Sequence, residues 1–555
     1  MVSGANKCHP AFFRVKFLSL PYGLTQTKIL TLMRGRNRLI GFVWAVVLLC
    51  ATLLGPPGVA WAGSDGTEVG SIEVAQCPFD RMRSASPGLM ARAGCGYLIA
   101  PQDHTQLDSP TIKLFFMQVK TANPNPQPDP IIFLEGGPGA SGVETMGMLF
   151  DRAAQTFFES RDLITFDQRG TGDSIPSLRC PEYSDLLVDS FTQSAGTGQV
   201  GANVGEQRNE ALLACRTRWI DEGVDLTTYH TVQNAADVDL LRRALGYDQV
   251  NLWGISYGTQ LALSVIRNYP DGVRSAVLEA VVPPQVNLFT STSAALDRAL
   301  NKLFSACAAD SACNRTYPKL GQKFYEMADK LAQKPVQLTL DHPITGEPIS
   351  VRFGAGEFLG AVQLALYNTR ALSMLPFQIR TADRNNTKLF ENYFRAALMG
   401  GETLATGMRI STLCADEAAF TSAEEIDASF NTGLAVNRIL GGGSGAAQIK
   451  LCRAWKPAQL GPWADDPVVS DIPTLLYMGE FDPVAPPEWG RMAAKTLTHS
   501  YPFEWRGYGH GITNSGDACP IQMMQDFLDA PNLRPSDACM SDLPNVKFFT
   551  PSRFK

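Results

Sequence analysis

The stretch VNLWGISYGTQLA, residues 250–262, places a single serine, Ser256, between two glycines. The apolar run Val250–Trp253 predicts a buried strand, and Tyr257–Asn268 has the spacing of a helix. A G-x-S-x-G turn between a strand and a helix strains the serine backbone and lifts the hydroxyl to the carboxyl edge of a sheet. The stretch therefore predicts that Ser256 is a nucleophile that attacks a carbonyl group.

The two glycines of this turn have a steric role. Side chains at Gly254 and Gly258 would collide with the neighbouring strand and helix. The helix after the turn begins at Tyr257, so its backbone N–H is expected to point at the oxyanion formed during attack. The motif is short and also occurs by chance, but the flanking strand and helix favour the functional interpretation.

A serine hydroxyl needs a base, since it is barely nucleophilic at neutral pH. His510 lies in a glycine-flanked loop, RGYGHG, just after a late strand. The loop GEFDPVAPP comes after the predicted strand Thr474–Met478 and supplies Asp482, which would orient the imidazole. Serine, then acid, then histidine is the order along the chain in the fold that uses this turn. Glu480 is the alternative acid. The non-catalytic alternative is that His510 is a surface-loop histidine and Asp482 a turn aspartate.

A second oxyanion donor is expected from a loop after an earlier strand. The loop EGGPGASG, residues 135–142, comes after the apolar run Ile131–Leu134. Its glycines allow a backbone N–H to approach the substrate, which makes Gly136 or Gly137 the expected donor. A plain Gly/Pro turn would explain the glycines but not their position in this order.

Strands alternate with helices in both terminal parts of the mature chain, which predicts a mostly parallel sheet with helices on both faces. Between these parts, the pattern is mostly helical, as in a cap over an active site. The expected segments are residues 1–62 as a targeting segment, 63–285 as the first part of the core, 286–471 as the cap and 472–555 as the second part of the core.

The N-terminus has the features of a secretory signal peptide. Arginines at 34, 36 and 38 precede an apolar run, Leu39–Leu54, and AWA is found at Ala60–Ala62. Met33 is an alternative start, because a signal that begins there has ordinary length. An uncleaved membrane anchor is the alternative, but the run is short and ends in prolines. We therefore expect an exported protein, periplasmic or extracellular, without stable membrane association after cleavage.

Composition limits the classes of partner. The chain has 555 residues, 45% hydrophobic and 18% charged, and a formal net charge of −6. A single core stops growing at roughly 250–300 residues, so a large insertion or a second domain is expected. Outside the N-terminus no run of Lys or Arg occurs, which argues against nucleic acid as a partner.

Twelve cysteines occur, and cleavage after Ala62 would leave an even ten. An exported chain usually keeps such a set as disulfides, although the sequence does not fix their connectivity. Pairing of neighbours would give Cys77–Cys95, Cys180–Cys215, Cys307–Cys313, Cys414–Cys452 and Cys519–Cys539. Ten buried thiols are the alternative. A metal site is not expected, because no C-x-x-C pair exists and histidines are scarce.

Together the motifs GGPG, DQRGTGDS (residues 167–174), GISYGT, GEFDPVAPP and GYGHG resemble the proline iminopeptidase/tripeptidyl aminopeptidase family of α/β-hydrolases. The cysteine placement and the segment Cys414–Glu417 are similar to its secreted tripeptidyl aminopeptidase branch. The resemblance covers roughly residues 75–545 and implies a serine exopeptidase that releases short N-terminal fragments without a metal or cofactor. Glu135 stands where proline iminopeptidases usually carry a histidine.

An exopeptidase must bind the ammonium group of its peptide substrate at a fixed distance from the serine. A carboxylate in a partly dehydrated cap would do so through a charge-assisted hydrogen bond. The candidate residues are Asp416, Glu417, Glu279 and Glu135. Two other functions remain open: an esterase or lipase of small acyl esters, since both reactions run through an acyl-enzyme, and a non-enzymatic binding protein on the same scaffold.

Overall fold

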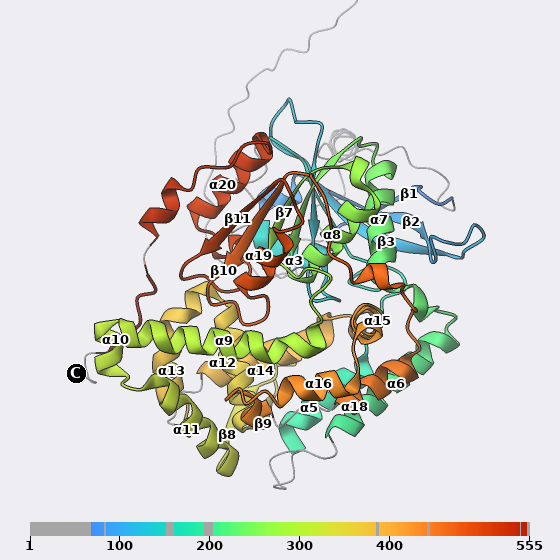
Figure 1. Ribbon diagram of the computed structural model, residues 1–555. Helices are drawn as coiled ribbons and strands as arrows, with labels where there is room; N and C mark the ends of the chain where they lie inside the picture. Colours follow the sequence, from blue (N-terminus) through green and yellow to red (C-terminus); the bar gives the residue numbers. More distant parts are fainter. Residues whose placement is uncertain are drawn as a thin grey trace, which may run out of the picture. The chain divides into compact units, whose positions relative to one another are not determined.

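The computed structural model describes most of the chain after the expected targeting segment (Figure 1). The described residues are 68–80, 82, 85–150, 160–193, 204–343, 345–383, 388–440, 445–543 and 545–551. The predicted signal, residues 1–62, lies outside these ranges.

A nine-stranded sheet forms the core, in the order β1-β2-β3-β5-β4-β6-β7-β10-β11. The strands are β1 (Ile72–Ala75), β2 (Ala93–Pro101), β3 (Thr111–Val119), β4 (Ile131–Leu134), β5 (Leu163–Phe166), β6 (Val250–Ile255), β7 (Val273–Glu279), β10 (Thr474–Gly479) and β11 (Ser500–Trp505). The first three strands and β5 pair antiparallel, and every pair from β5 to β11 is parallel. The prediction of a mostly parallel sheet is confirmed.

Helices cover both faces of this sheet. They are α3 (Gly142–Leu149), α7 (Thr231–Ala244), α8 (Tyr257–Asn268), α19 (Pro487–Ala493) and α20 (Ala518–Asp529). Side chains alternate along β4, so Ile132 and Leu134 pack with α7 and α8, whereas Ile131 and Phe133 pack with α3 and α20. All strand residues of β4 and β6 are buried, as expected for parallel strands with both faces covered.

The chain between β7 and β10 forms a second, largely helical layer below the sheet in Figure 1. Its helices are α9 (Leu288–Ala309), α10 (Ser311–Thr316), α11 (Leu320–Gln333), α12 (Ala355–Tyr367), α13 (Leu375–Thr381), α14 (Lys388–Thr403), α15 (Thr406–Asp416), α16 (Ala423–Phe430), α17 (Asn437–Leu440) and α18 (Gly445–Trp455). A hairpin of β8 (Val336–Asp341) and β9 (Pro348–Phe353) interrupts them. The mostly helical pattern of the sequence does not predict this hairpin, although β8 alternates exposed and half-buried residues as a strand does.

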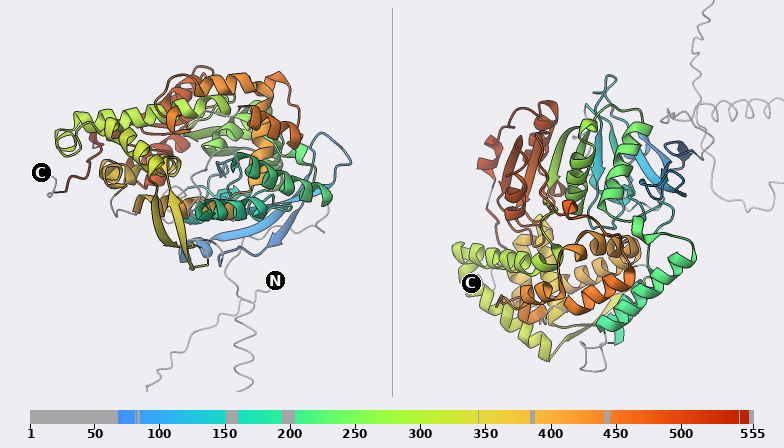
Figure 2. Two further views of the ribbon diagram at one scale, coloured as in Figure 1. Left: turned by 90° about the horizontal axis from the view of Figure 1, so that it is seen from below. Right: turned by 45° about the vertical axis from the view of Figure 1, so that its right-hand side comes forward.

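Two helices from the first part of the chain also join this layer. They are α5 (Pro181–Gln193) and α6 (Val204–Asp221), and Figure 2 shows them beside the inserted helices. Phe191 of α5 packs edge-on against Phe394, with ring centroids 5.4 Å apart, and Trp219 of α6 packs against Trp455 at 6.4 Å. The helical layer is therefore built from two separate stretches of sequence.

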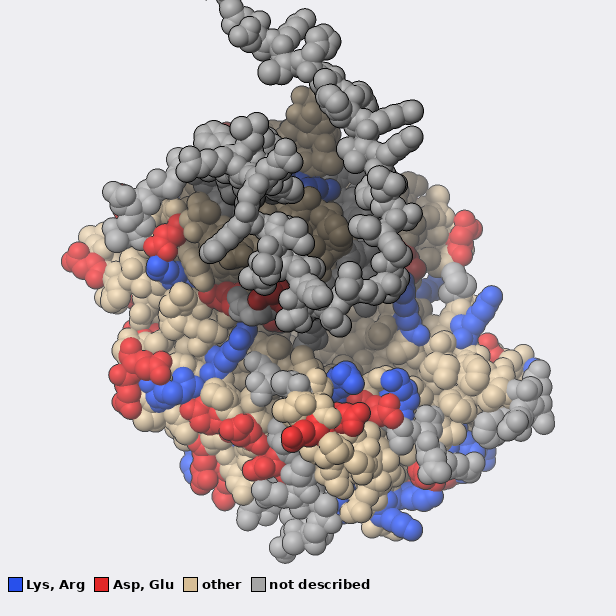
Figure 3. Space-filling model, turned by 180° about the vertical axis from the view of Figure 1, so that it is seen from behind, with Lys and Arg blue, Asp and Glu red and all other residues tan. Residues whose placement is uncertain are grey.

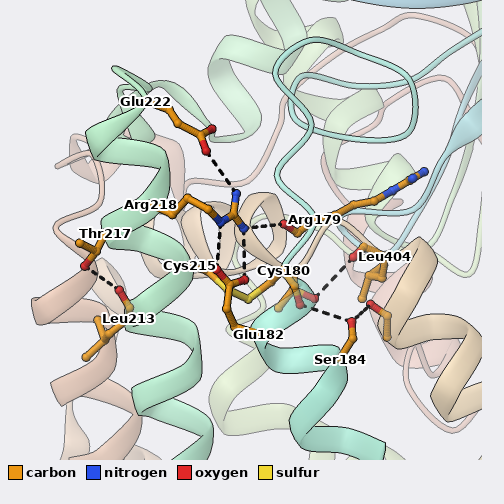
Figure 4. Close-up of a disulfide and its surroundings, with 12 residues drawn as sticks. Arg179, Cys180, Glu182, Ser184, Leu213, Cys215, Thr217, Arg218, Glu222 and Leu404 are labelled. Atoms are coloured by element: carbon orange, nitrogen blue, oxygen red, sulfur yellow. Dashed lines mark hydrogen bonds and ion pairs between the residues drawn. A yellow bond between two sulfur atoms is a disulfide. The ribbon is translucent and has the colours of Figure 1, made fainter.

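Five disulfides join the ten cysteines that come after the targeting segment. They are Cys77–Cys95, Cys180–Cys215, Cys307–Cys313, Cys414–Cys452 and Cys519–Cys539, as expected from neighbour pairing. Cys180 precedes α5 and Cys215 lies in α6, so their bond ties these two helices together (Figure 4). An ion pair between Glu182 and Arg218, 2.9 Å apart, links the same helices beside it.

The surface carries both signs of charge. On the face seen in Figure 3, acidic and basic side chains of the described residues are interspersed, and neither sign forms a continuous field there. In the described ranges, no helix combines the length and the apolarity that a membrane span requires.

Candidate active site

Ser256 lies at the turn between β6 and α8, at the carboxyl edge of the sheet. Its backbone has φ 59° and ψ −126°, a conformation that costs a non-glycine residue about 1–3 kcal/mol. A Cβ on Gly258 would overlap the carbonyl oxygen of Leu134, and one on Gly254 would overlap that of Gly258. The expected collisions are therefore real, and the glycines permit the turn.

Two backbone amides beside Ser256 remain free of protein partners. The N–H groups of Tyr257 and Gly137 donate to no protein acceptor in the described part of the chain. The N–H of Gly136, by contrast, donates to Oε1 of Glu135 at 2.8 Å. A Cβ on Gly136 would lie 3.5 Å from the Oγ of Ser256, so this loop directly borders the serine.

His510 and Asp482 form a hydrogen-bonded pair at the ends of β11 and β10. The Nδ1 of His510 lies 2.8 Å from Oδ2 of Asp482, whose side chain is fully buried. The other oxygen, Oδ1, accepts the backbone N–H groups of Val484 and Ala485, both at 2.9 Å. The carboxylate is thus held on both oxygens, and one of them orients the imidazole.

Glu480, the alternative acid, has other partners. Its Oε2 accepts the N–H of Gly507 at 2.7 Å, and its Oε1 pairs with Nζ of Lys302 at 2.7 Å. It therefore links the loop after β10 to the loop after β11 and to α9 of the cap. The structure pairs His510 with Asp482 and not with Glu480.

A second buried carboxyl organises the loop after β4. Asp167, at the end of β5, accepts the hydroxyl of Ser141 at 2.6 Å and the N–H of Asp173 at 2.8 Å. Burial raises the pKa of Asp167 to about 6, although these hydrogen bonds oppose the shift. Gln168 adds a bond from its side-chain amide to the carbonyl of Glu135, 2.9 Å long. The DQRGTGDS motif thus braces the glycine loop beside Ser256.

Among the four acids considered for the substrate amine, Glu279 is fully committed to the protein. It is completely buried at the end of β7. Its Oε1 accepts Nε1 of Trp253 at 2.8 Å and the hydroxyl of Thr513 at 2.7 Å, and its Oε2 accepts the N–H of Thr513 at 2.9 Å. It fastens the loop of His510 to the central strands.

Asp416 and Glu417 lie at the end of α15 and are also buried. Oδ2 of Asp416 accepts both the hydroxyl and the N–H of Thr231, and Oε2 of Glu417 accepts the N–H of Leu288 at 2.7 Å, where α9 begins. Burial raises the pKa of Asp416 to about 7 and that of Glu417 to about 8. Asp416 therefore joins the cap to α7 of the core, and Glu417 joins the end of α15 to the start of α9 within the cap.

Glu135 differs from the other three. It lies next to Gly136, which borders Ser256. Its Oε1 accepts the N–H of Gly136, and among the described residues its buried Oε2 has no partner within ordinary hydrogen-bond geometry. Burial raises the pKa of Glu135, and the hydroxyl of Thr145, the N–H of Gly136 and the nearby His510 oppose that shift. Of the four acids, only this one combines an uncommitted oxygen with a position beside the serine.

A cavity of about 930 Å³ lies against His510. Tyr367, at the end of α12, lines it, and its ring centroid is 4.6 Å from that of His510. The N–H of His510 also donates to the carbonyl of Tyr367 at 3.0 Å. Among the described residues that line it, Arg395 of α14 is the one arginine or lysine, and none is a carboxylate.

Two residues near the site carried no signal in the sequence. Tyr367 ends a helix, and Arg409 lies in the middle of another, α15. Neither sits in a recognisable motif, because both reach the site only when the helical layer folds over the sheet. Arg409 donates through Nη1 to the carbonyl of Gly137 at 2.5 Å.

One group of side chains has the composition of a metal site, Cys180, Glu182 and Cys215. The two sulfurs are bonded to each other, and the carboxylate pairs with Arg218 (Figure 4). These residues therefore do not fit a metal ion while the disulfide is intact.

Comparison with known families agrees with this geometry. Residues 129–306 match the family described as alpha/beta hydrolase fold, and the chain is an α/β-hydrolase. Residues 440–539 match the family described as TAP-like protein. The chain is therefore similar to the tripeptidyl aminopeptidase-like α/β-hydrolases.

Three relatives illustrate the range of similarity. Serine protease Hip1 of Mycobacterium tuberculosis is 23% identical over 479 residues, 82% of this chain and 89% of that protein. Tripeptidyl aminopeptidase of Streptomyces lividans is 29% identical over 199 residues, 34% of this chain and 35% of that protein. Carboxylesterase B of M. tuberculosis is 30% identical over 253 residues, 44% and 47% of the two chains.

Proposed function

We propose that this protein is a serine peptidase that cleaves near the free N-terminus of peptides. Ser256 would attack the scissile carbonyl, His510 would take its proton and return it to the leaving amine, and Asp482 would hold the imidazole. The N–H groups of Tyr257 and Gly137 would bind the oxyanion. The observation that carries this proposal is the strained Ser256 turn at the same sheet edge as the 2.8 Å His510–Asp482 pair.

The similarity to serine protease Hip1, over 89% of that protein, and the match to the TAP-like family favour a peptidase over other hydrolases. Glu135 is the residue we propose for the substrate ammonium, because it has an unpaired buried oxygen beside the serine. An arriving ammonium would pair with that oxygen and favour its ionised form. Glu279 and Glu417 are already bonded to the protein, and Asp416 holds Thr231 through Oδ2, although its Oδ1 is unpaired; we assign supporting roles to these three acids.

Export of the mature chain is part of the proposal. Five disulfides suit an oxidising compartment, periplasmic or extracellular. Thiol titration of denatured, unreduced protein should detect no more than trace thiol from the ten cysteines of the mature chain. Several titratable cysteines would contradict the compartment.

An esterase is the second candidate, and the similarity to carboxylesterase B favours it. A triad cannot distinguish the two reactions, since each passes through an acyl-enzyme. A binding protein without activity is separated from both by a fluorophosphonate probe, which should label Ser256 in an active enzyme and leave a Ser256→Ala variant unlabelled.

The deciding experiment compares chromogenic aminoacyl and tripeptidyl substrates, free and N-acetylated, with short acyl esters. A peptidase that requires the amine should cleave the free peptides much faster than the N-acetylated ones. Equal rates for the two would overturn the amine site. Cleavage of esters alone would replace the peptidase with an esterase.

A further inference from the structure

The helical layer places two arginines at the site, and neither has an acidic partner. Arg395 of α14 lines the cavity beside His510, and Arg409 of α15 touches the glycine loop. Neither residue forms an ion pair with any carboxylate in the described part of the chain. Arginines that face a catalytic site without a protein counter-ion are suited to bind an anionic group of a ligand.

The side chain of Arg409 lies along the glycine loop. Its Cβ lies 3.4 Å from where a Cβ on Gly139 would be, and its Nη1 reaches the carbonyl of Gly137. The side chain therefore reaches from Gly139 to Gly137, the residue after Gly136, which borders Ser256. One of its five N–H donors is used by Gly137, and the rest of the fork has no carboxylate partner.

The surroundings of Arg409 are aromatic. Burial lowers the pKa of Arg409, and the phenol groups of Tyr367 and Tyr183 act on it electrostatically in the opposite direction. Tyr367 also lines the cavity and packs against the ring of His510. Tyr367 thus lies near Arg409 and lines the same cavity as Arg395.

The cavity borders His510, the residue that would protonate the leaving amine. In a serine hydrolase, the histidine returns its proton to the leaving amine, so the departing segment lies against the imidazole. His510, Gly511 and Ser515 line the cavity, as do Arg395 and Tyr367. A cavity with a cation and no carboxylate suits a departing segment that carries a negative charge.

We propose that this cavity holds the departing segment of the substrate and that Arg395 and Arg409 bind a carboxylate on that segment. The inference rests on the proposed function, in which His510 protonates the leaving amine. The carboxylate has two possible sources: the free C-terminus of a short peptide, or an acidic side chain just after the scissile bond. Either would select substrates by the residues on the departing side of the scissile bond, in addition to the amine that precedes it.

The test uses matched peptides that end in a carboxylate or in an amide, with a neutral residue after the scissile bond. In the unmodified enzyme, kcat/KM should be about tenfold or more higher for the carboxylate, as a charge-assisted hydrogen bond implies. Arg395→Gln and Arg409→Gln should each bring this ratio toward one. Arg453→Gln, an exposed α18 position outside the cavity, is the matched control and should leave the ratio unchanged.

The source of the charge is separated by a third peptide, amidated but with aspartate after the scissile bond. If this peptide is cleaved as fast as the one that ends in a carboxylate, the arginines recognise the side chain. If it is cleaved as slowly as the neutral amidated peptide, they recognise the free C-terminus. Because Arg409 also contacts the glycine loop, its substitution could slow every substrate, so the ratio and not the rate is the readout. Equal rates for all three peptides in the unmodified enzyme would overturn the inference.

A pair of acyl esters keeps this test independent of peptidase activity. Their leaving groups are 4-hydroxybenzoate and 4-hydroxybenzamide, which differ mainly in charge. The unmodified enzyme should prefer the charged ester over the neutral one, and Arg395→Gln should lose that preference. If this holds while no peptide is cleaved, only the peptidase activity is rejected. Peptide cleavage without any preference for a carboxylate would reject the two arginines and leave the proposed function standing.

Discussion

Asp482 in the core and the Asp416–Glu417 pair in the cap are buried to a similar degree, yet they have different surroundings. In Asp482, Oδ2 is hydrogen-bonded to His510 and Oδ1 accepts two backbone N–H groups. Asp416 has only Thr231, with its Oδ1 left unpaired, and Glu417 has the N–H of Leu288. A buried carboxylate is stabilised by the hydrogen-bond donors that reach it. These acids therefore differ in how well the protein stabilises their ionised form.

The difference arises from local structure. The turn after β10 presents consecutive N–H groups to Asp482, as tight turns do for an aspartate side chain. Asp416 ends a helix, where free carbonyl groups and not N–H groups are exposed. Burial therefore raises the pKa of Asp416 and Glu417 and favours their neutral forms. Of these acids, only Asp482 is placed to stabilise an imidazolium.

The largest effect is expected at the nucleophile of the core. Ser256→Ala should lower kcat by about 10⁶-fold, since loss of this hydroxyl removes the acyl-enzyme route. Circular dichroism and thermal unfolding should show a folded protein, because the methyl group fits the same turn. Substantial residual turnover by folded protein would assign the reaction to another residue.

The core acid should have the next largest effect. Asp482→Asn is expected to lower kcat by about 10⁴-fold, because the imidazole loses the group that fixes its tautomer. Glu480→Gln is the matched control, since Glu480 lies in the same loop but bonds Gly507 and Lys302. If Glu480→Gln were the more damaging change in steady-state kinetics, the assignment of the acid would be reversed.

A third test sets Glu135 of the core loop against the cap acids. Glu135→Gln should lower kcat/KM for free-amine peptides by about 10²-fold, as unpairing a buried charge does, and should hardly change a small neutral ester. Asp416→Asn and Glu417→Gln should leave the ratio of peptide to ester unchanged. A cap variant that selectively lost the free-amine peptide would move the amine site into the cap.

The last test concerns stability and not activity, through its dependence on pH. Glu417 has a pKa of about 8 in the folded protein, above the value of an unfolded glutamate, so the native state retains a proton that the unfolded chain releases. Its stabilising contribution is present at acid pH and is lost as pH rises toward 8, by about 1.4 kcal/mol per pH unit for one proton.

Glu417→Gln removes this dependence while its amide oxygen can still accept from Leu288. Urea unfolding at pH 5, 6.5 and 8 should show the variant gaining stability relative to the unmodified protein as pH rises. Parallel pH profiles for the two proteins would mean that Glu417 is ionised in the folded state, and the contrast with Asp482 would fail.

Much of the fold and the candidate site could be predicted from local sequence. The alternation of strands and helices, the glycines at 254 and 258, and the order Ser256, Asp482, His510 depend on short segments whose geometry the backbone dictates. The five disulfides also join neighbouring cysteines, with sequence separations of 6–38 residues. Features of this kind need few long-range contacts, so they are visible in the sequence.

The tertiary structure decided the features that depend on distant segments. The sequence offered four acids as candidates for binding the substrate amine. Only packing revealed that Glu279, Asp416 and Glu417 are bonded to Thr513, Thr231 and Leu288, respectively. The positions of Tyr367 and Arg409 likewise result from how the helical layer closes over the sheet. Burial and hydrogen-bond supply are properties of three-dimensional neighbours, and the residue type alone does not contain them.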